Sequence, residues 1–335
     1  TKESPVKRPV RLAAVAAAGI LALALSSCSG SAPAGEESAG GTTRIKVATI
    51  GVTTEGSLFL GIDQGFFAEE GLEVETSVVA NAPAGLAAAQ SGQVEIAYTP
   101  TIPLLNALSQ GVPLKVVSAA DGYPEQAAEH PEDFDSTGLF AAIGSDISSV
   151  ADLKGKTIAV PARNAQLEVV VSDELRNAGV DPASQVEWVV LDFTSALSAL
   201  QGGTVDAAAL VNPFSTQAKD AGAHQLSAPS IGFFEGGTTA VWAAGSSTIE
   251  KKPEVVAAFQ RAIAKANEYA NQHPDEAIQA GIDATGSKLS VDQVKLPAWP
   301  VVMDVADLER TNRKMAELGF LKTPVELDGV VLEAK

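Results

Sequence analysis

Residues 44–79 read RIKVATIGVTTEGSLFLGIDQGFFAEEGLEVETSVV, and this stretch decides the fold class. Its first seven residues, 44–50, are rich in branched side chains that nearly alternate with polar ones, which predicts a strand. An apolar-periodic stretch over 58–70 predicts a helix that Gly71 ends, and residues 72–79 alternate again as a second strand. Strand, helix and strand in this order are typical of a parallel sheet covered by helices.

The same alternation continues along the chain and then restarts near residue 138. Further strands are predicted at residues 94–98, 114–119, 138–143, 156–160, 186–191, 205–211 and 238–244. Further helices are predicted at residues 83–91, 102–109, 165–178, 194–201, 253–272, 274–285, 290–295 and 304–318, with a short capped turn at 149–155. The last segment, 325–334, has no obvious sheet to join. A folded part of this length exceeds one ordinary core and favours two lobes, with crossings near residues 120–137 and 235–240.

The N-terminal segment has the pattern of an export signal. A basic start is followed by an apolar run over 12–25, which is shorter than the roughly 20 residues that a membrane-spanning helix needs. Residues 25–30 read LSSCSG and resemble the lipobox of bacterial lipoproteins, in which the cysteine thiol is acylated and the chain is cut before it. We therefore expect a signal peptide over 1–27 and a lipid on Cys28. An ordinary signal peptide with a chance cysteine is the alternative.

Composition limits the partners of the mature chain. Residues 28–43 consist almost wholly of small and polar residues without a hydrophobic period, which predicts a flexible tether. Loss of residues 1–27 would remove four basic residues and one acid, and the formal charge would change from −18 to −21. Such an acidic surface repels nucleic acid and anionic lipid headgroups. Because Cys28 is the only cysteine, no internal disulfide is expected.

Several segments of the chain together carry a family resemblance. They are 60–75 (LGIDQGFFAEEGLEVE), 88–97 (AAQSGQVEIA), 111–117 (GVPLKVV), 152–161 (DLKGKTIAVP), 200–209 (LQGGTVDAAA), 212–214 (NPF), 253–259 (PEVVAAF), 269–270 (YA) and 274–277 (PDEA). These segments resemble the solute-binding proteins of ABC importers, in particular the nitrate/sulfonate/taurine and thiamine-pyrimidine-precursor group, and the resemblance covers roughly residues 44–320. Their order along the chain, rather than any single segment, makes the resemblance specific.

The resemblance implies a fold of the α/β class, the two-lobe type II fold of periplasmic binding proteins. Each lobe would be a mostly parallel sheet flanked by helices, and two crossover segments would act as hinges. Lobe I would comprise residues 44–120 plus 240–335, and lobe II residues 121–239. A receptor of this kind would work as a monomer without a cofactor or metal.

The candidate ligand site lies in the loops that follow the strands. Ligands of open parallel sheets bind beyond the carboxyl ends of the strands. The resemblance implies that the loops 53–58, 99–101, 163–166 and 212–214 face the cleft. The candidate ligand-binding residues are Thr53, Thr54, Glu55, Ser57, Asn81, Thr99, Thr101, Asp121, Tyr123, Arg163, Asn164, Gln166, Asn212 and Phe214.

Four of these candidates bear on what the ligand is. Arg163 precedes a predicted helix, whose N-terminus favours an anion, so its guanidinium is a candidate clamp for a sulfonate, carboxylate or nitrate. A solvated surface arginine is the alternative. Glu55 would instead favour an amine if it points inward. Tyr123 and Phe214 are candidate aromatic walls, or else part of the hinge or the core. The class of solute stays open.

The expected function is that of an extracytoplasmic lipoprotein, anchored to the outer face of the bacterial cytoplasmic membrane. It would capture a small organic solute, either a sulfonate-, taurine- or nitrate-like anion or a pyrimidine-like heterocycle, and deliver it to an ABC permease. A non-transport surface protein with the same fold is one alternative.

An enzyme of thiamine-pyrimidine metabolism is a second alternative, which the sequence disfavours. His130, His224 and His273 have no metal-ligand spacing, and the chain has neither a Gly-x-Ser-x-Gly elbow nor a glycine-rich phosphate loop at its first strand. The related pyrimidine-forming enzymes use a cysteine-rich iron motif, which a chain with one cysteine lacks. We therefore expect a binding protein and not an enzyme.

Overall fold

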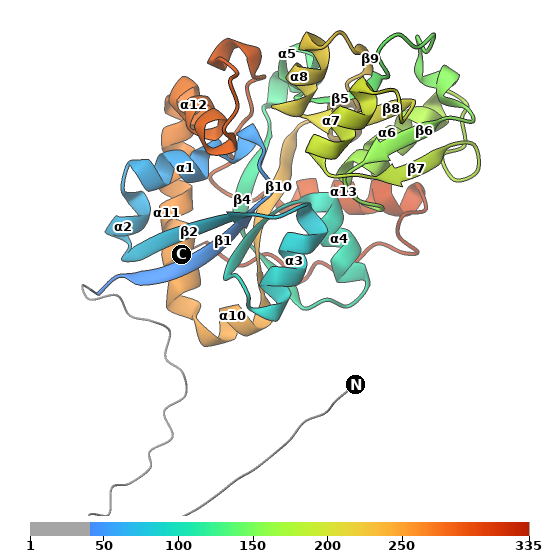
Figure 1. Cartoon of the computed structure of the whole chain (residues 1–335). Coiled ribbons are helices and arrows are strands. Elements are labelled where there is room, and N and C mark those ends of the chain that lie inside the picture. The colour runs from blue at the N-terminus through green and yellow to red at the C-terminus, as the bar shows by residue number, and fades with distance from the viewer. Residues whose placement is uncertain (1–40, 335) are drawn as a thin grey trace, which may run out of the picture. The chain divides into compact units, whose positions relative to one another are not determined.

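Two five-stranded sheets carry the fold in the computed structural model, which describes residues 41–334 (Figure 1). The first sheet has the strand order β2-β1-β3-β10-β4. Its strands are β1 (Thr43–Thr49), β2 (Leu72–Val78), β3 (Ile96–Pro100), β4 (Leu114–Tyr123) and β10 (Gly237–Gly245). β1 runs parallel to β2 and β3, whereas β10 runs antiparallel to β3 and β4. A strand from late in the chain therefore lies between two early ones.

The second sheet repeats this plan with the order β7-β6-β8-β5-β9. Its strands are β5 (Thr137–Ala141), β6 (Thr157–Val160), β7 (Glu187–Val190), β8 (Ala207–Val211) and β9 (His224–Ser227). β6 runs parallel to β7 and β8, and β5 runs antiparallel to β8 and β9. In each sheet the inserted antiparallel strand is the first one after the chain has crossed from the other sheet.

The α/β fold with two sheets is confirmed, but each sheet is mixed and not mostly parallel. Each has two parallel and two antiparallel pairings. Alternating strands and helices predict parallel neighbours only where a helix returns the chain along the same sheet. β5 and β10 instead follow the crossover segments 124–136 and 228–236, and the local pattern carries no information about direction after such a crossing.

Most of the helices pack around the first sheet (Figure 1). They are α1 (Gly56–Asp63), α2 (Phe66–Glu69), α3 (Ala82–Ser91), α4 (Thr101–Ser109), α10 (Ser246–Lys251), α11 (Pro253–Gln272), α12 (Pro274–Thr285) and α13 (Val305–Glu317), with 3-10 turns η1 (Thr53–Glu55) and η4 (Val291–Gln293). α11 buries Val256, Phe259, Ile263 and Ala266, whose spacing of three or four residues places them on one face. That face lies against α1, α2 and β4.

One predicted helix is in fact two. The stretch 58–70 forms α1 and α2, and Gly65 between them has a φ of 80°. A left-handed backbone of this kind favours glycine and interrupts an α-helix. The apolar period runs through the break because both helices bury their apolar side chains on the same side, against α11.

Helices of unequal length surround the second sheet. They are α5 (Pro131–Phe134), α6 (Gln166–Asn177), α7 (Phe193–Gln201), α8 (Phe214–Asp220) and α9 (Pro229–Phe234), with 3-10 turns η2 (Glu125–Ala128) and η3 (Val150–Leu153). The sequence predicted α6 and α7 but not the short helices. α5, α8, α9 and the strand β9 have four to seven residues each, too few to show a helical or strand period.

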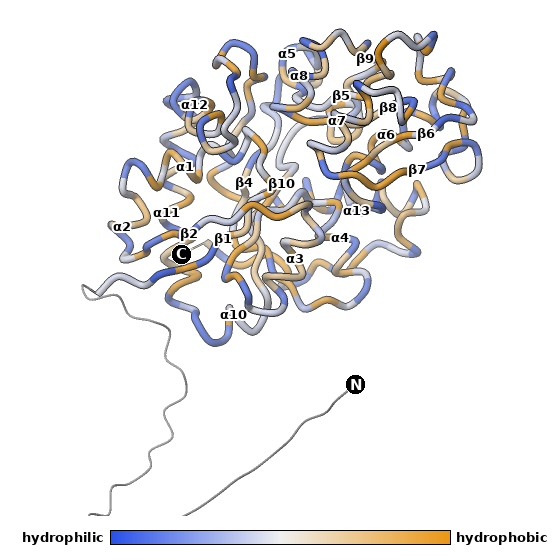
Figure 2. The backbone as a smooth tube through the Cα atoms, viewed as in Figure 1, coloured by the Kyte–Doolittle hydropathy of each residue, from blue (hydrophilic) through white to orange (hydrophobic). Residues whose placement is uncertain are grey.

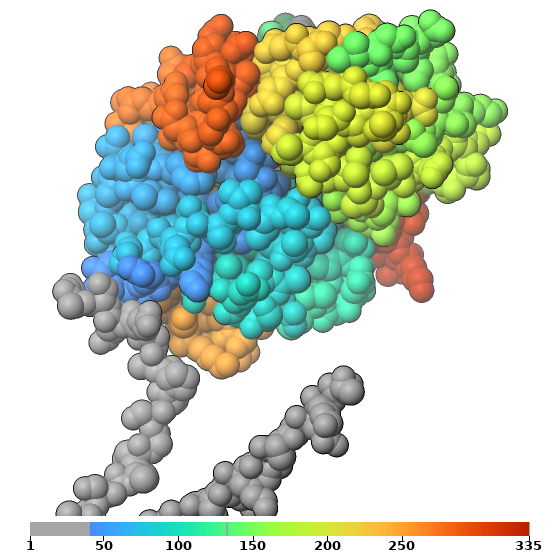
Figure 3. Space-filling model, viewed as in Figure 1, coloured from blue at the N-terminus to red at the C-terminus, as the bar shows by residue number. Residues whose placement is uncertain are grey.

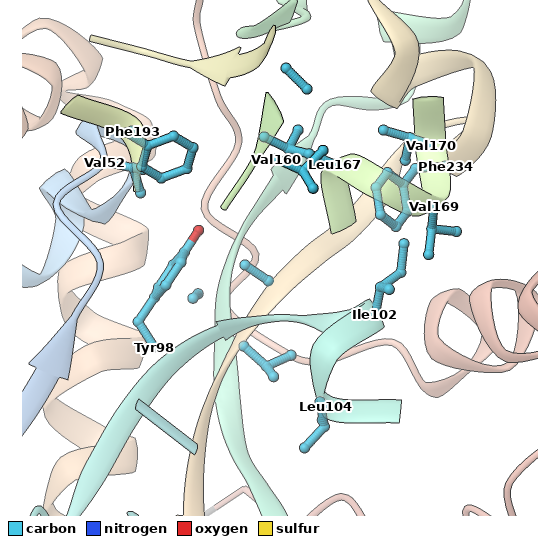
Figure 4. Packing of buried hydrophobic residues seen from close by; sticks show 14 of the residues in the cluster. Val52, Tyr98, Ile102, Leu104, Val160, Leu167, Val169, Val170, Phe193 and Phe234 are labelled. Carbon is cyan, nitrogen blue, oxygen red and sulfur yellow. The ribbon is translucent and has the colours of Figure 1, made fainter. Parts of the chain in front are cut away.

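A continuous cluster of buried apolar side chains extends through both sheets. Hydrophobic residues concentrate along the strands, and hydrophilic ones at the outer loops and helix ends (Figure 2). Ile102 at the start of α4 lies near Val169 of α6 and Phe234 of α9 (Figure 4). Helices that flank the first sheet therefore pack against helices that flank the second.

The C-terminal segment joins the first sheet after all. Val331 forms a parallel bridge with Val116 of β4, and the amide of Leu332 donates to the carbonyl of Val116 at 2.9 Å. Further along β4, Ala298 forms an antiparallel bridge with Gly122. This second bridge brings residues 295–300 beside the crossover. Within residues 41–334, no helix combines the length and the apolar character needed to cross a bilayer.

Candidate functional site

A cavity of about 80 Å³ lies where the ends of the parallel strands of the two sheets face each other. Ile50 and Pro100 border it at the ends of β1 and β3, and Pro161 and Val211 border it at the ends of β6 and β8. One water molecule needs roughly 10–15 Å³ in a cavity, so several non-hydrogen atoms fit here. The segment around residue 200 meets the segment of α3 and α4 on the face drawn in Figure 3. The cavity therefore lies where ligands of such folds are expected.

Six of the fourteen candidate residues line this cavity, and eight do not. The lining residues are Thr54, Asn81, Asp121, Tyr123, Gln166 and Asn212. Those outside the lining are Thr53, Glu55, Ser57, Thr99, Thr101, Arg163, Asn164 and Phe214. The strand-end loops thus bring six of the candidates to this cavity, but position in a loop does not reveal which of its side chains turn toward the cavity.

Glu55 turns back onto its own loop and not into the cavity. Its carboxylate accepts hydrogen bonds from the backbone amides of Ile50, Gly51 and Val52 at 2.8, 3.1 and 3.2 Å. The side chain is buried, and burial is the main reason why the pKa of Glu55 is raised to about 8. Glu55 therefore shapes the loop after β1 and does not offer a charge to an amine.

Arg163 is engaged by a residue of its own chain. Its guanidinium contacts the carboxylate of Glu168 at 2.8 and 3.0 Å and lies over the Trp188 ring, 5.9 Å from the centroid. The same carboxylate accepts a hydrogen bond from the amide of Asn164 in front of α6. The hypothesis of an anion clamp at Arg163 therefore finds no support in the geometry, because the place foreseen for a ligand anion is taken by Glu168.

The aromatic wall differs from the one that the sequence suggested. Tyr123 lines the cavity, and its hydroxyl donates to Asp135 at 3.1 Å. Phe214 lies one layer further out, where it stacks on Phe193 with 5.3 Å between the ring centroids. Of these two stacked rings, it is Phe193, the first residue of α7, that lines the cavity. Sequence reasoning missed it because Phe193 reads equally well as the start of an amphipathic helix.

Tyr98 and Asp121 form the polar floor of the cavity. The Tyr98 hydroxyl donates to Asp121 at 2.6 Å, and the Thr239 hydroxyl donates to the other carboxylate oxygen at 3.3 Å. Figure 4 shows the Tyr98 hydroxyl directed toward the Phe193 ring. Burial raises the pKa of Asp121, while hydrogen bonds from neighbouring hydroxyls, Tyr98 first, lower it. Tyr98 was missed because it belongs to β3 itself, whereas the predicted site took the following residues.

A second buried carboxylate, Asp135, joins the two crossover segments. It accepts hydrogen bonds from the Tyr123 hydroxyl and from the backbone amides of Thr137, Ser230 and Ile231. Because its partners come from β4, β5 and α9, Asp135 ties the outgoing crossover to the returning one. Burial raises the pKa of Asp135, and the hydrogen bonds oppose that rise.

Few polar contacts bridge the two sides of the cavity. The Thr53 amide donates to the Asn212 carbonyl at 3.5 Å, and the Asn81 side chain donates to the Pro161 carbonyl at 3.4 Å. Both are longer than an ordinary N–H···O bond of roughly 2.7–3.2 Å. These two hydrogen bonds therefore hold the two sides of the cavity together only weakly.

Among residues 41–334, Lys295 is the one basic side chain that lines the cavity. It lies after η4, in the segment that the bridge between Ala298 and Gly122 holds beside β4. No local signal pointed to it, because its place depends on a contact between residues that are far apart in the sequence. Among residues 41–334, no group of three or more His, Cys, Asp or Glu side chains is arranged to hold a metal ion.

Comparisons with known proteins agree on one family and one fold. A model of the family described as NMT1/THI5 like matches residues 53–277. The taurine-binding periplasmic protein of Escherichia coli (strain K12) is 28% identical over 213 residues, which make up 64% of this chain and 62% of that protein. The chain thus spans less than two thirds of the length of that relative.

Two solved structures share the fold at lower identity. The alkanesulfonate-binding protein SsuA from Xanthomonas axonopodis pv. citri, bound to MOPS, is 16% identical with a TM-score of 0.70, over 87% of this chain and 98% of that chain. The desulfurization enzyme DSZB is 17% identical with a TM-score of 0.60, over 86% of this chain and 96% of that chain. Binding proteins and an enzyme therefore share this fold.

Proposed function

Because the chain belongs to the NMT1/THI5-like family, we propose that it is the solute-binding protein of an ABC importer. This membership confirms the family predicted from the sequence. In the proposal, lobe I (44–120 plus 240–335) and lobe II (121–239) close around one small solute. The protein then presents the solute to a membrane permease.

The observation that carries this proposal is the cavity between the two sheets. It is bordered on both sides by the ends of parallel strands, and apolar side chains make up most of its wall, with a few polar groups between them. The hydrogen bonds that cross it directly are few and long. A solute that contacts both sides would therefore supply much of the free energy that favours closure.

The proposal includes export and a lipid anchor. The signal peptide (1–27), Cys28 and most of the tether (28–43) lie outside the described residues, so this part rests on the sequence pattern alone. A lipidated Cys28 would hold the receptor at the outer face of the cytoplasmic membrane, beside its permease. Mass spectrometry of the intact protein from a bacterial membrane fraction tests this, and a chain that retains residues 1–27 without acylation would contradict it.

We further propose that the chain binds its solute without converting it. The curated relative is a binding protein by its name, whereas DSZB shows that the fold also occurs in an enzyme. Among the residues that line the cavity there is no histidine or cysteine to act as a base or nucleophile, and no serine–histidine pair. Recovery of a chemically altered solute after incubation with the protein would contradict this proposal.

A thermal-shift screen tests solute binding directly. The panel contains sulfonates, taurine, nitrate, pyrimidines, flavins and aromatic acids. A cognate solute at 100 times its Kd stabilises the folded state by about 2.7 kcal/mol, which corresponds to roughly 4 °C in Tm for a chain of this size. If no member of the panel raises the Tm, solute binding of this class is contradicted.

Two matched variants show whether a hit binds in the cavity. Gln166 starts α6 and lines the cavity, whereas Gln201 ends α7 and is exposed. We expect Gln166→Ala to weaken binding of the hit and Gln201→Ala to leave it unchanged. Equal effects of the two variants would place the hit elsewhere.

A further inference from the structure

The charges in the cavity are few and unequally buried. In the part of the chain that the structure describes, two charged side chains line it, Asp121 and Lys295. Asp121 is 5% exposed and lies at the floor, whereas Lys295 is only partly buried. Arg163, the other basic candidate, is paired with Glu168 and does not line the cavity. The deepest charged group that a solute meets is therefore a carboxylate.

Asp121 has hydroxyl partners but no cation. Its oxygens accept hydrogen bonds from the Tyr98 and Thr239 hydroxyls, and the Thr54 hydroxyl is a third partner. Of the ion pairs found within residues 41–334, none involves Asp121. An ionised carboxylate offers about four acceptor positions, so at least one remains after these bonds. A buried carboxylate without a counter-ion is destabilising unless a partner arrives.

The surroundings of Asp121 select against an anion at the floor. A sulfonate or nitrate placed there would face a carboxylate, and no arginine of the lining would offset the repulsion. An ammonium group would instead bind the carboxylate through a charge-assisted hydrogen bond at the remaining acceptor position. The rings of Tyr98 and Phe193, together with Val52, leave an apolar wall for the remainder of such a solute.

We propose that the solute presents an ammonium group to Asp121 at the floor of the cavity, with its apolar part against Phe193 and Val52. This inference rests on the proposed function and narrows it to amine-bearing solutes. An acidic group elsewhere on the solute is compatible with it, because Lys295 also lines the cavity and is less buried than Asp121. The Asp121 contact, and not an anion clamp, then sets the specificity.

Calorimetric titration of the full chain with two matched pairs of probes tests the proposal. The pairs are benzylamine with benzyl alcohol, and taurine with isethionate. Within each pair an ammonium group replaces a hydroxyl and little else changes. A charge-assisted hydrogen bond contributes enough to predict an affinity at least about tenfold higher for the amine of each pair that binds. Equal affinities, or tighter binding of the hydroxyl compound, overturn the proposal without any variant.

Two aspartate variants locate the effect. Asp121→Asn keeps the shape and an acceptor for Tyr98 but removes the charge. Asp63→Asn, at the exposed end of α1, is the matched control. We expect the amine preference to vanish in the first variant and to persist in the second. An amine preference that survives Asp121→Asn, in protein that unfolds cooperatively, overturns the assignment to Asp121.

The solute screen separates this inference from the proposed function. If neither amine binds, the inference is overturned. A screen hit that has no ammonium or N–H group then leaves solute binding intact, whereas a screen without any hit removes both. The two failures are therefore distinguishable by their hits.

Discussion

The loop after β1 and the loop after β6 use the same device in two electrostatic settings. Each follows the central parallel strand of its sheet, and each contains a residue with a left-handed backbone, Gly51 at φ 73° and Asn164 at φ 54°. In each, a glutamate from the next helical segment turns back to accept backbone amide hydrogens of the loop: Glu55 in the first and Glu168 in the second.

The difference lies in the partner of the carboxylate. Glu168 has the Arg163 guanidinium at 2.8 Å, and that guanidinium is half exposed. Glu55 has backbone amides alone and is fully enclosed, so burial raises its pKa to about 8. The same loop architecture is thus held by an ion pair on one side of the cavity and by a carboxyl group that binds its proton near neutral pH on the other.

Removing the enclosed carboxylate is expected to have the largest effect. Glu55→Ala leaves three backbone amides without their acceptor, and we expect a loss of about 3–4 kcal/mol in the free energy of unfolding, measured with urea. Glu55→Gln retains an acceptor oxygen and should lose clearly less. A loss below about 1 kcal/mol for the alanine variant would contradict this account of the loop.

The raised pKa of Glu55 makes a second prediction, about pH. The carboxyl group holds its proton in the folded state up to pH of about 8, but releases it near its ordinary value of 4.5 when unfolded. Between these values the folded state binds more protons, so stability falls as pH rises, by at most about 1.4 kcal/mol per pH unit. Unfolding in urea at pH 5, 6.5 and 8 measures the slope. Glu55→Gln should flatten it, and parallel curves for the two proteins would refute the assignment.

Removal of the other carboxylate should be milder. Glu168→Ala deprives the Asn164 amide of its acceptor, but Arg163 is exposed enough to be solvated. We expect a loss of about 1–2 kcal/mol in the free energy of unfolding. If Glu168→Ala proved as destabilising as Glu55→Ala, the contrast between the two loops would be wrong.

The smallest effect on solute binding is expected for the arginine itself. Arg163→Ala leaves the buried Glu168 carboxylate with the Asn164 amide but without its counter-ion, and we expect a loss of about 1–2 kcal/mol in the free energy of unfolding. We also expect an unchanged Kd for whichever solute the screen finds, because Arg163 does not line the cavity. A Kd weakened tenfold or more by Arg163→Ala would restore the anion clamp.

The position of the site could be predicted from the sequence, but its inner surface could not. Strand ends follow from local patterns, and three candidates from such loops, Asn81, Gln166 and Asn212, line the cavity. Thr99 and Thr101 lie within three residues of Tyr98 in the chain. Both are fully buried, yet neither lines the cavity. A loop of three residues has no period that tells which side chains point outward, so the neighbours in space decide.

The sequence by itself determined the family, the order of the longer strands and helices, and the loops that border the cavity. These depend on patterns that span a few residues, because a strand or helix shows its buried face through its own spacing. Only the tertiary structure decided the direction of β5 and β10, the pairing of Arg163 with Glu168, and the meeting of Asp121 with Tyr98 and Thr239. Charge and packing act through space, and Thr239 lies 118 residues from the carboxylate that it contacts.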